Sequence, residues 1–269
     1  MKLNPMIRID SRLFELGLAS SRSQAAQLIA RGIVEVDGNK VLKPSLKVSA
    51  EQNLVVLEAK NFVSRAGFKL DHALESFSLN AEGKICLDIG ASTGGFSDCL
   101  LQRGAKLVLA LDVGTAQLAK PIADNPAVIE LSNQNIREFS QSKLIEINDE
   151  FRKLSLVVCD LSFISITHAL PIVYSLSGRL DFIGLIKPQF EVGQHSLSAS
   201  GVVSDWRERK RSIDQVIDAS KKLGFSVLGL EQSPIKGATG NQEYLIWLNK
   251  GDEKLPKWDG SVEALARGN

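Results

Sequence analysis

A glycine-rich turn between an apolar run and a helical pattern constrains the fold of this chain more than any other feature. The run from Ile85 to Ile89 is apolar apart from Asp88. Small residues follow it directly, in the order Gly90, Ala91, Ser92, Thr93, Gly94 and Gly95, and then comes Phe96. The pattern predicts a strand, a tight turn and the start of a helix, which is where open α/β sheets hold ligands. Glycines let the backbone approach such a ligand closely, because no Cβ intervenes.

Two acidic residues mark the ends of the first two predicted strands. Asp88 lies at the carboxyl end of the first strand, and Asp112 follows the run from Lys106 to Leu111 about one βα unit later. A carboxylate in the second position can accept hydrogen bonds from ribose hydroxyls. We therefore expect a nucleoside ligand to lie between the glycine turn and Asp112.

The spacing of the glycines distinguishes the possible nucleoside ligands. The chain has Gly90-x-x-x-Gly94-Gly95, whereas dinucleotide sites use G-x-G-x-x-G. A P-loop is also excluded, because no Gly-Lys-Ser or Gly-Lys-Thr follows the turn. A carboxylate before a loose glycine turn suits S-adenosylmethionine, a sulfonium cation with an amino-acid tail and no phosphate. The alternative is an ordinary βα turn without a ligand.

Composition limits the remaining possibilities. The chain of 269 residues can form one or two domains, and 44% hydrophobic with 23% charged residues is typical of a soluble globular protein. The net charge of +1 gives no overall basic field, so any affinity for nucleic acid must come from local patches. No stretch approaches the roughly 18 apolar residues of a membrane span, and we expect a cytoplasmic protein without stable membrane association.

Cysteines and histidines give no sign of a metal site. The three cysteines lack C-x-x-C spacing, and the three histidines do not cluster with them or with carboxylates. These residues are Cys86, Cys99, Cys159, His72, His168 and His195. We expect buried, reduced thiols and no structural metal.

Residues 1–60 have the pattern of a separate small α+β unit. Asp10 is expected to cap a helix from Ser11 to Leu16, and Ser21 with Gln24 forms a capping-box pattern for a second helix that ends near Arg31. Alternating apolar residues on both sides of Asp37-Gly38 predict a hairpin, and Leu54 to Leu57 predicts another strand.

Basic residues gather in this unit and have two interpretations. The cations singled out are Arg8, Arg12, Arg22, Arg31 and Lys40. They are either solvated helix faces or a surface that contacts RNA phosphates. Residues 7 to about 57 resemble the RNA-binding module first seen in ribosomal protein S4, through Arg8-Ile9-Asp10-x-x-Leu13, Ser21-Arg22-Ser23-x-Ala25 and Gly32-x-Val34-x-Val36-Asp37-Gly38. That resemblance implies that the two helices dock on structured RNA.

The remainder, residues 61–250, alternates strands and helices, which predicts a doubly wound, mostly parallel sheet; residues 251–269 are expected to form a loose tail. Ionisable residues lie at its strand ends. Asp160 and Lys187 each end an apolar run, Glu243 opens a late strand, and Lys69 lies in the helix before the first strand. If the late strand is antiparallel to its neighbours, all four meet at one sheet edge. Buried charges persist only when paired, so such a set suggests a site, although each residue alone is typical of a solvated strand end.

If the reaction is methyl transfer to a ribose 2′-hydroxyl, the chemistry needs residues of this kind. The hydroxyl is a poor nucleophile until its proton is removed or strongly hydrogen-bonded. A lysine serves as base only when burial or a nearby cation favours its neutral form, and Lys69 beside Lys187 supplies that cation. Asp160 and Glu243 would orient the ammonium groups and relay protons, although their charges oppose this effect.

The domain also resembles the TlyA family, which joins an S4-like module to an FtsJ-like methyltransferase domain with a Rossmann-like sheet. The matching motifs are Ser64-Arg65-x-Gly67-x-Lys69-Leu70, Asp88 to Phe96, Asp112-Val113-Gly114, Asp160 to Ile164, Leu185 to Glu191 and Gly240-Asn241-x-Glu243-Tyr244. The resemblance implies a ribosomal RNA cytidine 2′-O-methyltransferase that uses S-adenosylmethionine, with a catalytic tetrad at Lys69, Asp160, Lys187 and Glu243. It also implies that Asn135 lies near the adenosyl group.

Three other functions remain open at this point. The hemolysin label of the family suggests a membrane-active protein, which the sequence supports poorly. A ribosome-binding factor without catalysis would keep the same fold, and only an activity assay separates it from the enzyme. A methyltransferase for small molecules would leave the N-terminal unit without a role.

Overall fold

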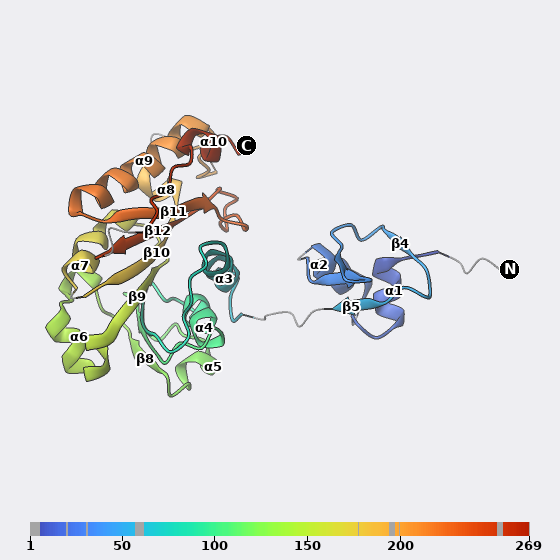
Figure 1. Ribbon diagram of the computed structural model, residues 1–269, viewed down its shortest axis with the longest axis horizontal. Helices are drawn as coiled ribbons and strands as arrows, with labels where there is room; N and C mark the ends of the chain where they lie inside the picture. Colours follow the sequence, from blue (N-terminus) through green and yellow to red (C-terminus); the bar gives the residue numbers. More distant parts are fainter. Residues whose placement is uncertain are drawn as a thin grey trace. The chain divides into compact units, whose positions relative to one another are not determined.

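The computed structural model describes residues 6–19, 21–30, 32–56, 62–176, 178–193, 197–198, 200–251 and 255–268 (Figure 1). Contacts between residues divide the chain into two compact units, Met1–Asn61 and Phe62–Asn269. Each unit has a hydrophobic core of its own, so we describe each by itself.

The first unit packs two helices against short strands. The helices are α1 (Ile9–Glu15) and α2 (Arg22–Ala30), and the strands are β1 (Ile7–Arg8), β2 (Val34–Val36), β3 (Asn39–Lys40), β4 (Lys47–Val48) and β5 (Leu54–Val56). Strands β3, β2 and β5 form one antiparallel sheet, and β1 pairs with β4. The expected hairpin is confirmed: Asp37 and Gly38 have φ of 51° and 80°, which is typical of a two-residue turn.

The two helix starts of this unit differ in how well the sequence predicted them. The Ser21 hydroxyl accepts a hydrogen bond from the Gln24 amide at 3.1 Å, as the capping-box pattern indicates. Asp10 is not the cap of α1, because the helix already begins at Ile9. Its buried carboxylate accepts hydrogen bonds from Arg8 and from the Ser11 amide. The side chain therefore anchors arginines instead of opening the helix.

The second unit is built on a seven-stranded sheet in the order β11-β12-β10-β9-β6-β7-β8. The strands are β6 (Ile85–Ile89), β7 (Leu107–Leu111), β8 (Val128–Leu131), β9 (Leu154–Cys159), β10 (Leu180–Ile186), β11 (Ser226–Gln232) and β12 (Tyr244–Lys250). All neighbouring pairs from β10 to β8 are parallel, whereas β12 is antiparallel to both β10 and β11. The doubly wound, mostly parallel sheet is thus confirmed.

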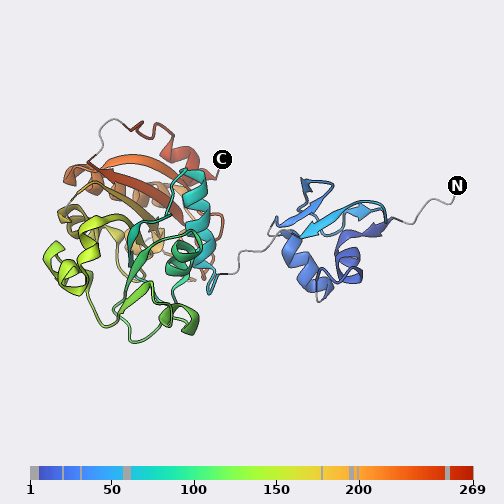
Figure 2. The same ribbon diagram turned by 60° about the horizontal axis from the view of Figure 1, so that its bottom comes forward.

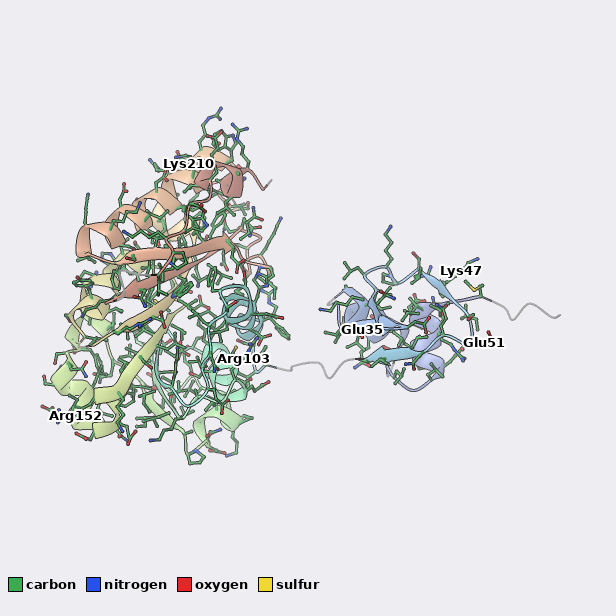
Figure 3. The ribbon with its side chains drawn as sticks, in the orientation of Figure 1. Glu35, Lys47, Glu51, Arg103, Arg152 and Lys210 are labelled. Carbon is green, nitrogen blue, oxygen red and sulfur yellow. The ribbon has the colours of Figure 1, made fainter. Side chains whose placement is uncertain are left out.

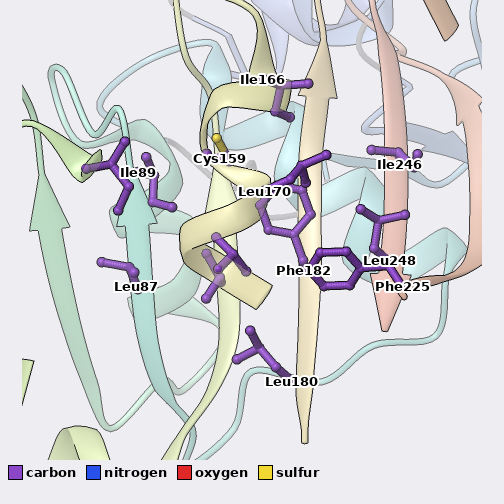
Figure 4. Close-up of a cluster of buried hydrophobic side chains, with 14 of the residues drawn as sticks. Leu87, Ile89, Cys159, Ile166, Leu170, Leu180, Phe182, Phe225, Ile246 and Leu248 are labelled. Carbon is purple, nitrogen blue, oxygen red and sulfur yellow. The ribbon is translucent and has the colours of Figure 1, made fainter. Parts of the chain in front are cut away.

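Helices cover both faces of this sheet (Figures 1 and 2). One face packs on α3 (Ala66–Ser76) and α4 (Gly95–Gln102). The other face packs on a second group of elements: η1 (Ile136–Glu138), α6 (Gln141–Ile147), η2 (Asp149–Lys153), η3 (Ile166–His168), α7 (Leu170–Ser175) and α9 (Trp206–Leu223). Two further helices, α5 (Lys120–Ala123) and α8 (Pro188–Glu191), each form a single turn after a strand. Figure 4 shows Leu170 of α7 packed over Phe182 of β10 on that second face.

The C-terminal segment differs from the loose tail that its composition suggests. Helix α10 (Val262–Arg267) packs against α9, and Ala266 is buried. The Trp258 amide also donates a hydrogen bond to the Val227 carbonyl of β11 at 3.0 Å. The sequence did not predict this packing, because only Ala266 and a few half-buried side chains make the contact and they form no clear apolar pattern.

Helix α9 begins at Trp206, although its first buried apolar residue is Ile213. Its first turns are strongly charged, so the apolar periodicity that marks a helix is weak there. The Asp205 carboxylate caps the helix by accepting a hydrogen bond from the Arg207 amide at 2.9 Å.

Three expectations concern absent features, and each can be checked only where the chain is described. Cys86, Cys99 and Cys159 are buried thiols that form no disulfide. Across the described ranges, no group of three histidine, cysteine or acidic side chains has a geometry for a metal ion. His195 lies outside those ranges. None of the helices in the described part of the chain has the length and apolar character needed to cross a bilayer.

Candidate active site

Strand register brings the four predicted ionisable residues to one edge of the sheet. In the parallel pairs, Ile89 of β6 lies opposite Cys159 of β9, and Asp160 follows that residue directly. In the antiparallel pair, Ile186 of β10 lies opposite Tyr244 of β12. Lys187 and Glu243 are the next residues at that same end of these two strands. The antiparallel last strand is therefore what returns Glu243 to the carboxyl ends of its neighbours.

One lysine–carboxylate pair joins α3 to the start of β12. The Lys69 Nζ lies 2.5 Å from the Glu243 Oε2, and the two residues are 8% and 2% exposed. Gly237 approaches the other oxygen so closely that a Cβ there would lie 2.5 Å from Oε1. This carboxylate is thus held between an ammonium group and a glycine backbone.

A second pair joins the end of β9 to the end of β10. The Lys187 Nζ lies 2.7 Å from the Asp160 Oδ1 and donates a hydrogen bond to the Ser162 Oγ at 2.8 Å. The same ammonium lies 5.9 Å from the centre of the Phe190 ring. Of these polar contacts, only that with Ser162 is a hydrogen bond, so the ammonium group keeps protons for another acceptor.

Two adjoining cavities contain these residues. A cavity of about 400 Å³ is lined by both lysines and Glu243, and we call it the acceptor cavity. A smaller cavity of about 130 Å³ is lined by Asp160 and the glycine turn. Ser64, Ala66 and Ser162 line both, so the two volumes meet at these side chains. A larger cavity of about 860 Å³ lies between α9 and the C-terminal segment, and none of the predicted site residues lines it.

The glycine turn after β6 is shaped by close approaches. Gly90 has φ of +83°, and a Cβ there would lie 2.9 Å from the Asp160 carbonyl oxygen. A Cβ on Gly95 would lie 2.1 Å from the Ser64 Oγ. Gly94 is the left-handed residue before α4, with φ of 89°. The backbone therefore comes as near to the cavity as sterics permit.

Asp112 joins two turns around the predicted ribose position. Its Oδ2 accepts a hydrogen bond from the Ser92 amide at 2.8 Å, and its Oδ1 accepts one from the Gly114 amide at 2.7 Å. Each carboxylate oxygen keeps a further lone pair for a ligand. Asn135 is exposed, and its Oδ1 caps η1 by accepting from the Arg137 amide at 3.0 Å. It lines neither cavity, but the amide of the preceding Gln134 donates a hydrogen bond to the Asp112 carbonyl at 3.0 Å.

Asp88 is fully buried at the end of β6 and is only half satisfied. Its Oδ2 accepts a hydrogen bond from the Ser97 hydroxyl at 2.7 Å, whereas its Oδ1 has no partner among the described residues. Burial, with the nearby charges of Asp160 and Asp112, raises the pKa of this carboxyl to about 7, against the lowering effect of the hydrogen bond from Ser97. A cationic ligand in the adjoining cavity would reverse that effect.

Two contributors to the site were not predicted from the sequence. Phe163 is 87% exposed at the mouth of the acceptor cavity, and its ring lies 5.5 Å from the ring of Phe190. Its φ of 70° is uncommon for a residue with a side chain. The buried Glu191 fixes the same loop, because its two oxygens accept from the Ser165 hydroxyl and the Ile166 amide. Both lie in motifs noted above, but only the loop conformation shows their role.

The predicted basic residues of the first unit lie near carboxylates. Arg8 and Arg22 share Asp10, at 2.7 and 3.6 Å, and Arg12 lies 3.3 Å from Glu15. The hydrogen bond from Arg8 lowers the pKa of Asp10 to about 2, against the opposing effect of burial. Lys40 is exposed on β3, and Arg31 lies outside the described residues.

Comparisons with protein families match the two units separately. The model of the FtsJ-like methyltransferase family matches residues 62–250, and the model of the S4 domain matches residues 7–54.

Curated relatives and a solved structure span nearly the whole chain. The chain is 40% identical, over 97% of its length and 96% of the relative, to the 16S/23S rRNA (cytidine-2′-O)-methyltransferase TlyA of Mycobacterium tuberculosis. It is 41% identical to Hemolysin A of Brachyspira hyodysenteriae, over 89% of its length and 98% of that protein. A hemolysin-labelled structure from Streptococcus thermophilus superposes with a TM-score of 0.70 at 34% identity, covering 99% of this chain and 96% of that one.

Proposed function

The chain belongs to the TlyA family of FtsJ-like methyltransferases with an S4 domain, and on that premise we propose that it methylates a ribose 2′-hydroxyl of ribosomal RNA. The methyl donor is S-adenosylmethionine, and cytidine is the proposed target because the Mycobacterium tuberculosis relative is named for it. One observation carries the proposal: Lys69 and Lys187, each paired with a carboxylate, line one cavity that adjoins the glycine turn.

The smaller cavity and its surroundings fit S-adenosylmethionine. When bound, this cofactor supplies an electrophilic methyl group on a cationic sulfur. The buried Asp88 comes two residues before Gly90 and keeps one oxygen without a partner among the described residues. The absence of a Cβ at Gly90 lets the turn pack closely against the backbone of Asp160, which lines the cavity. Asp112 keeps lone pairs for ribose hydroxyls. The other proposed cofactor contacts are Ser92, Thr93, Gly94, Gly95, Phe96 and Asn135.

We assign proton removal to Lys187, with Asp160 as its partner. The carboxylate first takes a proton from the ammonium group, which leaves a neutral amine 2.7 Å away. The amine then removes the proton of the 2′-hydroxyl as the oxygen–carbon bond forms, and the electron pair of the broken sulfur–carbon bond stays on sulfur. Ser162 fixes the direction of Lys187 throughout, because its hydroxyl accepts from the same nitrogen.

Lys69 serves as the fixed cation of the site. Its ion pair with the buried Glu243 holds the ammonium in one position within the acceptor cavity. Two of its protons remain for oxygen atoms of the substrate. A fixed positive charge next to the reacting oxygen stabilises the negative charge that develops there.

The exposed ring of Phe163 suits the base of the target nucleotide. Stacking of a nucleobase on an aromatic side chain contributes about 1–3 kcal/mol and requires an accessible ring face. Phe190 supports this ring from the cavity side. The base would then lie at the mouth of the cavity while its ribose enters.

RNA docking is assigned to the cations of the S4 domain. Arg8 and Arg22 share a single carboxylate, so that group retains a net positive charge. With Arg12, Arg31 and Lys40, they would contact phosphates of a structured RNA. The Arg22→Gln variant should raise KM for ribosomal subunits several-fold without changing kcat, because Arg8 still holds Asp10.

The proposal is tested with the purified protein, labelled S-adenosylmethionine and unmethylated ribosomal subunits. We expect label in the RNA, and mass spectrometry should place it on a ribose 2′-oxygen. Cofactor binding measured by calorimetry verifies that the protein is competent. Bound subunits without label would support a ribosome-binding factor instead, and label on a base or on a small molecule would also contradict the proposal.

A further inference from the structure

A second polar cavity lies beside the acceptor cavity and has an unusual charge. It encloses about 320 Å³ and is lined by Arg209, Lys236 and Arg267, with no carboxylate among its lining residues. We call it the cationic cavity. Arg267 is paired with Glu263, which lies outside the lining, so the cavity faces three cations and one nearby acid. An anion in the cavity would relieve the mutual repulsion of these cations.

Arg209 is half-buried, and three backbone carbonyls hold its guanidinium in place. Its Nε donates to the Ala266 carbonyl at 3.0 Å, and its Nη1 donates to the Val203 and Ser204 carbonyls at 3.1 and 2.7 Å. These neutral oxygens hold the guanidinium in place but do not cancel its charge. Within the described parts of the chain, no carboxylate forms an ion pair with it.

The other two cations differ in mobility. Arg267 is oriented, because its guanidinium lies 3.8 Å from the centre of the Trp206 ring and 2.8 Å from the Glu263 carboxylate. Lys236 is exposed on the loop between β11 and β12. An anion in the cavity would thus meet one fixed charge, one oriented charge and one long flexible side chain.

The same loop lines both cavities. Gly237 and Thr239 border the acceptor cavity, while Lys236, Gly240 and Gln242 border the cationic cavity. Glu243, which holds Lys69, follows Gln242 directly, and consecutive residues of an extended chain face opposite sides. In RNA, the 2′-oxygen and the 3′-phosphate are attached to neighbouring carbons of one ribose. A ribose in the acceptor cavity therefore carries a phosphate close to this loop.

We propose that the cationic cavity binds a backbone phosphodiester of the substrate RNA, next to the ribose that is methylated. This inference rests on the proposed function. It gives the methyltransferase domain an RNA contact of its own, separate from the S4 domain, and that contact sets which ribose reaches Lys187. A phosphodiester suits the site because its charge is offered by every nucleotide, so the contact fixes position without reading sequence.

The test compares the salt dependence of binding for the full-length wild type and the Lys236→Gln/Arg267→Gln variant. Arg209 is left intact because it holds Val203 and Ala266. Filter binding of unmethylated ribosomal subunits between 50 and 200 mM KCl gives the slope of log K against log salt. Loss of the contact with this one phosphate should reduce that slope by about 1 and raise KM about tenfold, with kcat and cofactor binding unchanged.

Two matched variants separate charge from packing. Glu263→Gln breaks the same ion pair as Arg267→Gln but keeps the cation, so it should not weaken binding. Arg152→Gln removes an exposed cation before the start of β9, at the other end of the sheet (Figure 3), and should leave the slope unchanged. If Glu263→Gln behaves like Arg267→Gln, packing of α10 explains the loss and the proposal fails.

The remaining outcomes are also decisive. An unchanged slope in a variant with a normal melting curve overturns the proposal. A loss seen with intact subunits but not with deproteinised ribosomal RNA would assign the cavity to a ribosomal protein, which also overturns it. Because binding is measured without turnover, a wild type that binds but does not methylate would refute the proposed function and still test this inference.

Discussion

Each unit of the molecule buries an aspartate, and the two carboxylates titrate in opposite directions. Asp10 of the S4 domain lies between Arg8 and Arg22, and the hydrogen bond from Arg8 lowers its pKa to about 2. Asp88 of the methyltransferase domain has a single hydroxyl partner, Ser97, and burial raises its pKa to about 7. Burial alone does not determine the charge of a carboxyl group, because hydrogen bonds and neighbouring charges also shift its pKa.

The difference follows from what each unit is proposed to bind. The S4 domain must present cations to an anionic polymer, so a shared carboxylate orients its arginines without neutralising them. The methyltransferase domain must receive a cationic cofactor, so its carboxylate is left with an unused oxygen. In the first unit, arginines of the same chain provide the positive charge beside the buried carboxylate. In the second unit, we propose that the cationic cofactor provides it.

The largest expected effect separates chemistry from docking. Lys187→Met should lower kcat about 10²- to 10⁴-fold, because it removes the proposed base, while binding of ribosomal subunits changes less than about twofold. Single-turnover methylation and filter binding measure the two. Because the change leaves Asp160 without its partner, the Lys187→Met/Asp160→Asn variant checks that the fold is kept. Lys84→Met, which breaks the Lys84–Asp181 pair, is the control and should retain activity.

Next in size is a contrast between two glycines with the same backbone conformation. Gly38 in the S4 domain and Gly90 have φ of +80° and +83°, but only Gly90 meets another atom, the Asp160 oxygen, at the position of a Cβ. Gly38→Ala should cost about 1–2 kcal/mol of stability and leave cofactor binding unchanged. Gly90→Ala should raise the Kd for S-adenosylmethionine more than about tenfold. If Gly38→Ala and Gly90→Ala changed cofactor binding equally, the proposed role of the Gly90 turn in binding the cofactor would be wrong.

A smaller effect is expected from two exposed phenylalanines. Phe163→Ala should raise KM for ribosomal subunits roughly tenfold through lost stacking, whereas Phe163→Tyr should restore it. Phe14→Ala in the S4 domain, where the ring is 50% exposed, should change KM less than about twofold, because docking there uses charge. Steady-state kinetics at one salt concentration suffice. If Phe14→Ala raised KM more than Phe163→Ala does, the contact with the nucleobase would have to be assigned to the first unit instead.

The last contrast is a pH dependence of stability with opposite sign in the two units. Folded Asp88 keeps its proton up to about pH 7, whereas the unfolded chain releases it near pH 3.9, so lowering the pH from 7 towards 4 should stabilise the second unit. Folded Asp10 resists protonation down to about pH 2, so the first unit should lose stability as the pH falls from about 4 towards 2.

The pH dependence of stability can be measured separately in the two units. All three tryptophans lie in the second unit, so their fluorescence reports its unfolding alone, and amide exchange reports the first unit. Asp88→Asn and Asp10→Asn should each flatten the profile of their own unit and leave the other unchanged. Cofactor binding should also weaken as the pH falls below 7 in the wild type but not in Asp88→Asn.

Local patterns predicted those parts of the fold that depend on a few neighbouring residues. Asp37-Gly38 predicted the hairpin, and the run from Ile85 to Gly95 predicted a strand, a turn and the start of a helix. The meeting of Lys187 with Asp160 also followed from topology, because parallel strands place their carboxyl ends together. Their roles in catalysis stay predictions.

Local patterns did not predict features that depend on tertiary contacts or on an unusual backbone conformation. Asp10 has the composition of a helix cap, but its partners Arg8 and Arg22 come from two different helix starts. The exposed ring of Phe163 depends on a left-handed backbone that no residue type there requires. The docking of α10 rests on small buried surfaces that give no periodic signal.

The insertion of the last strand between two earlier ones has a consequence for biosynthesis. Strand β12 lies between β10 and β11, and the residue directly before it, Glu243, is the acid that holds Lys69. A nascent chain that has not yet reached Glu243 carries three members of the proposed catalytic set and lacks the strand that completes the sheet. The proposed active site can therefore assemble only after this last strand has been made.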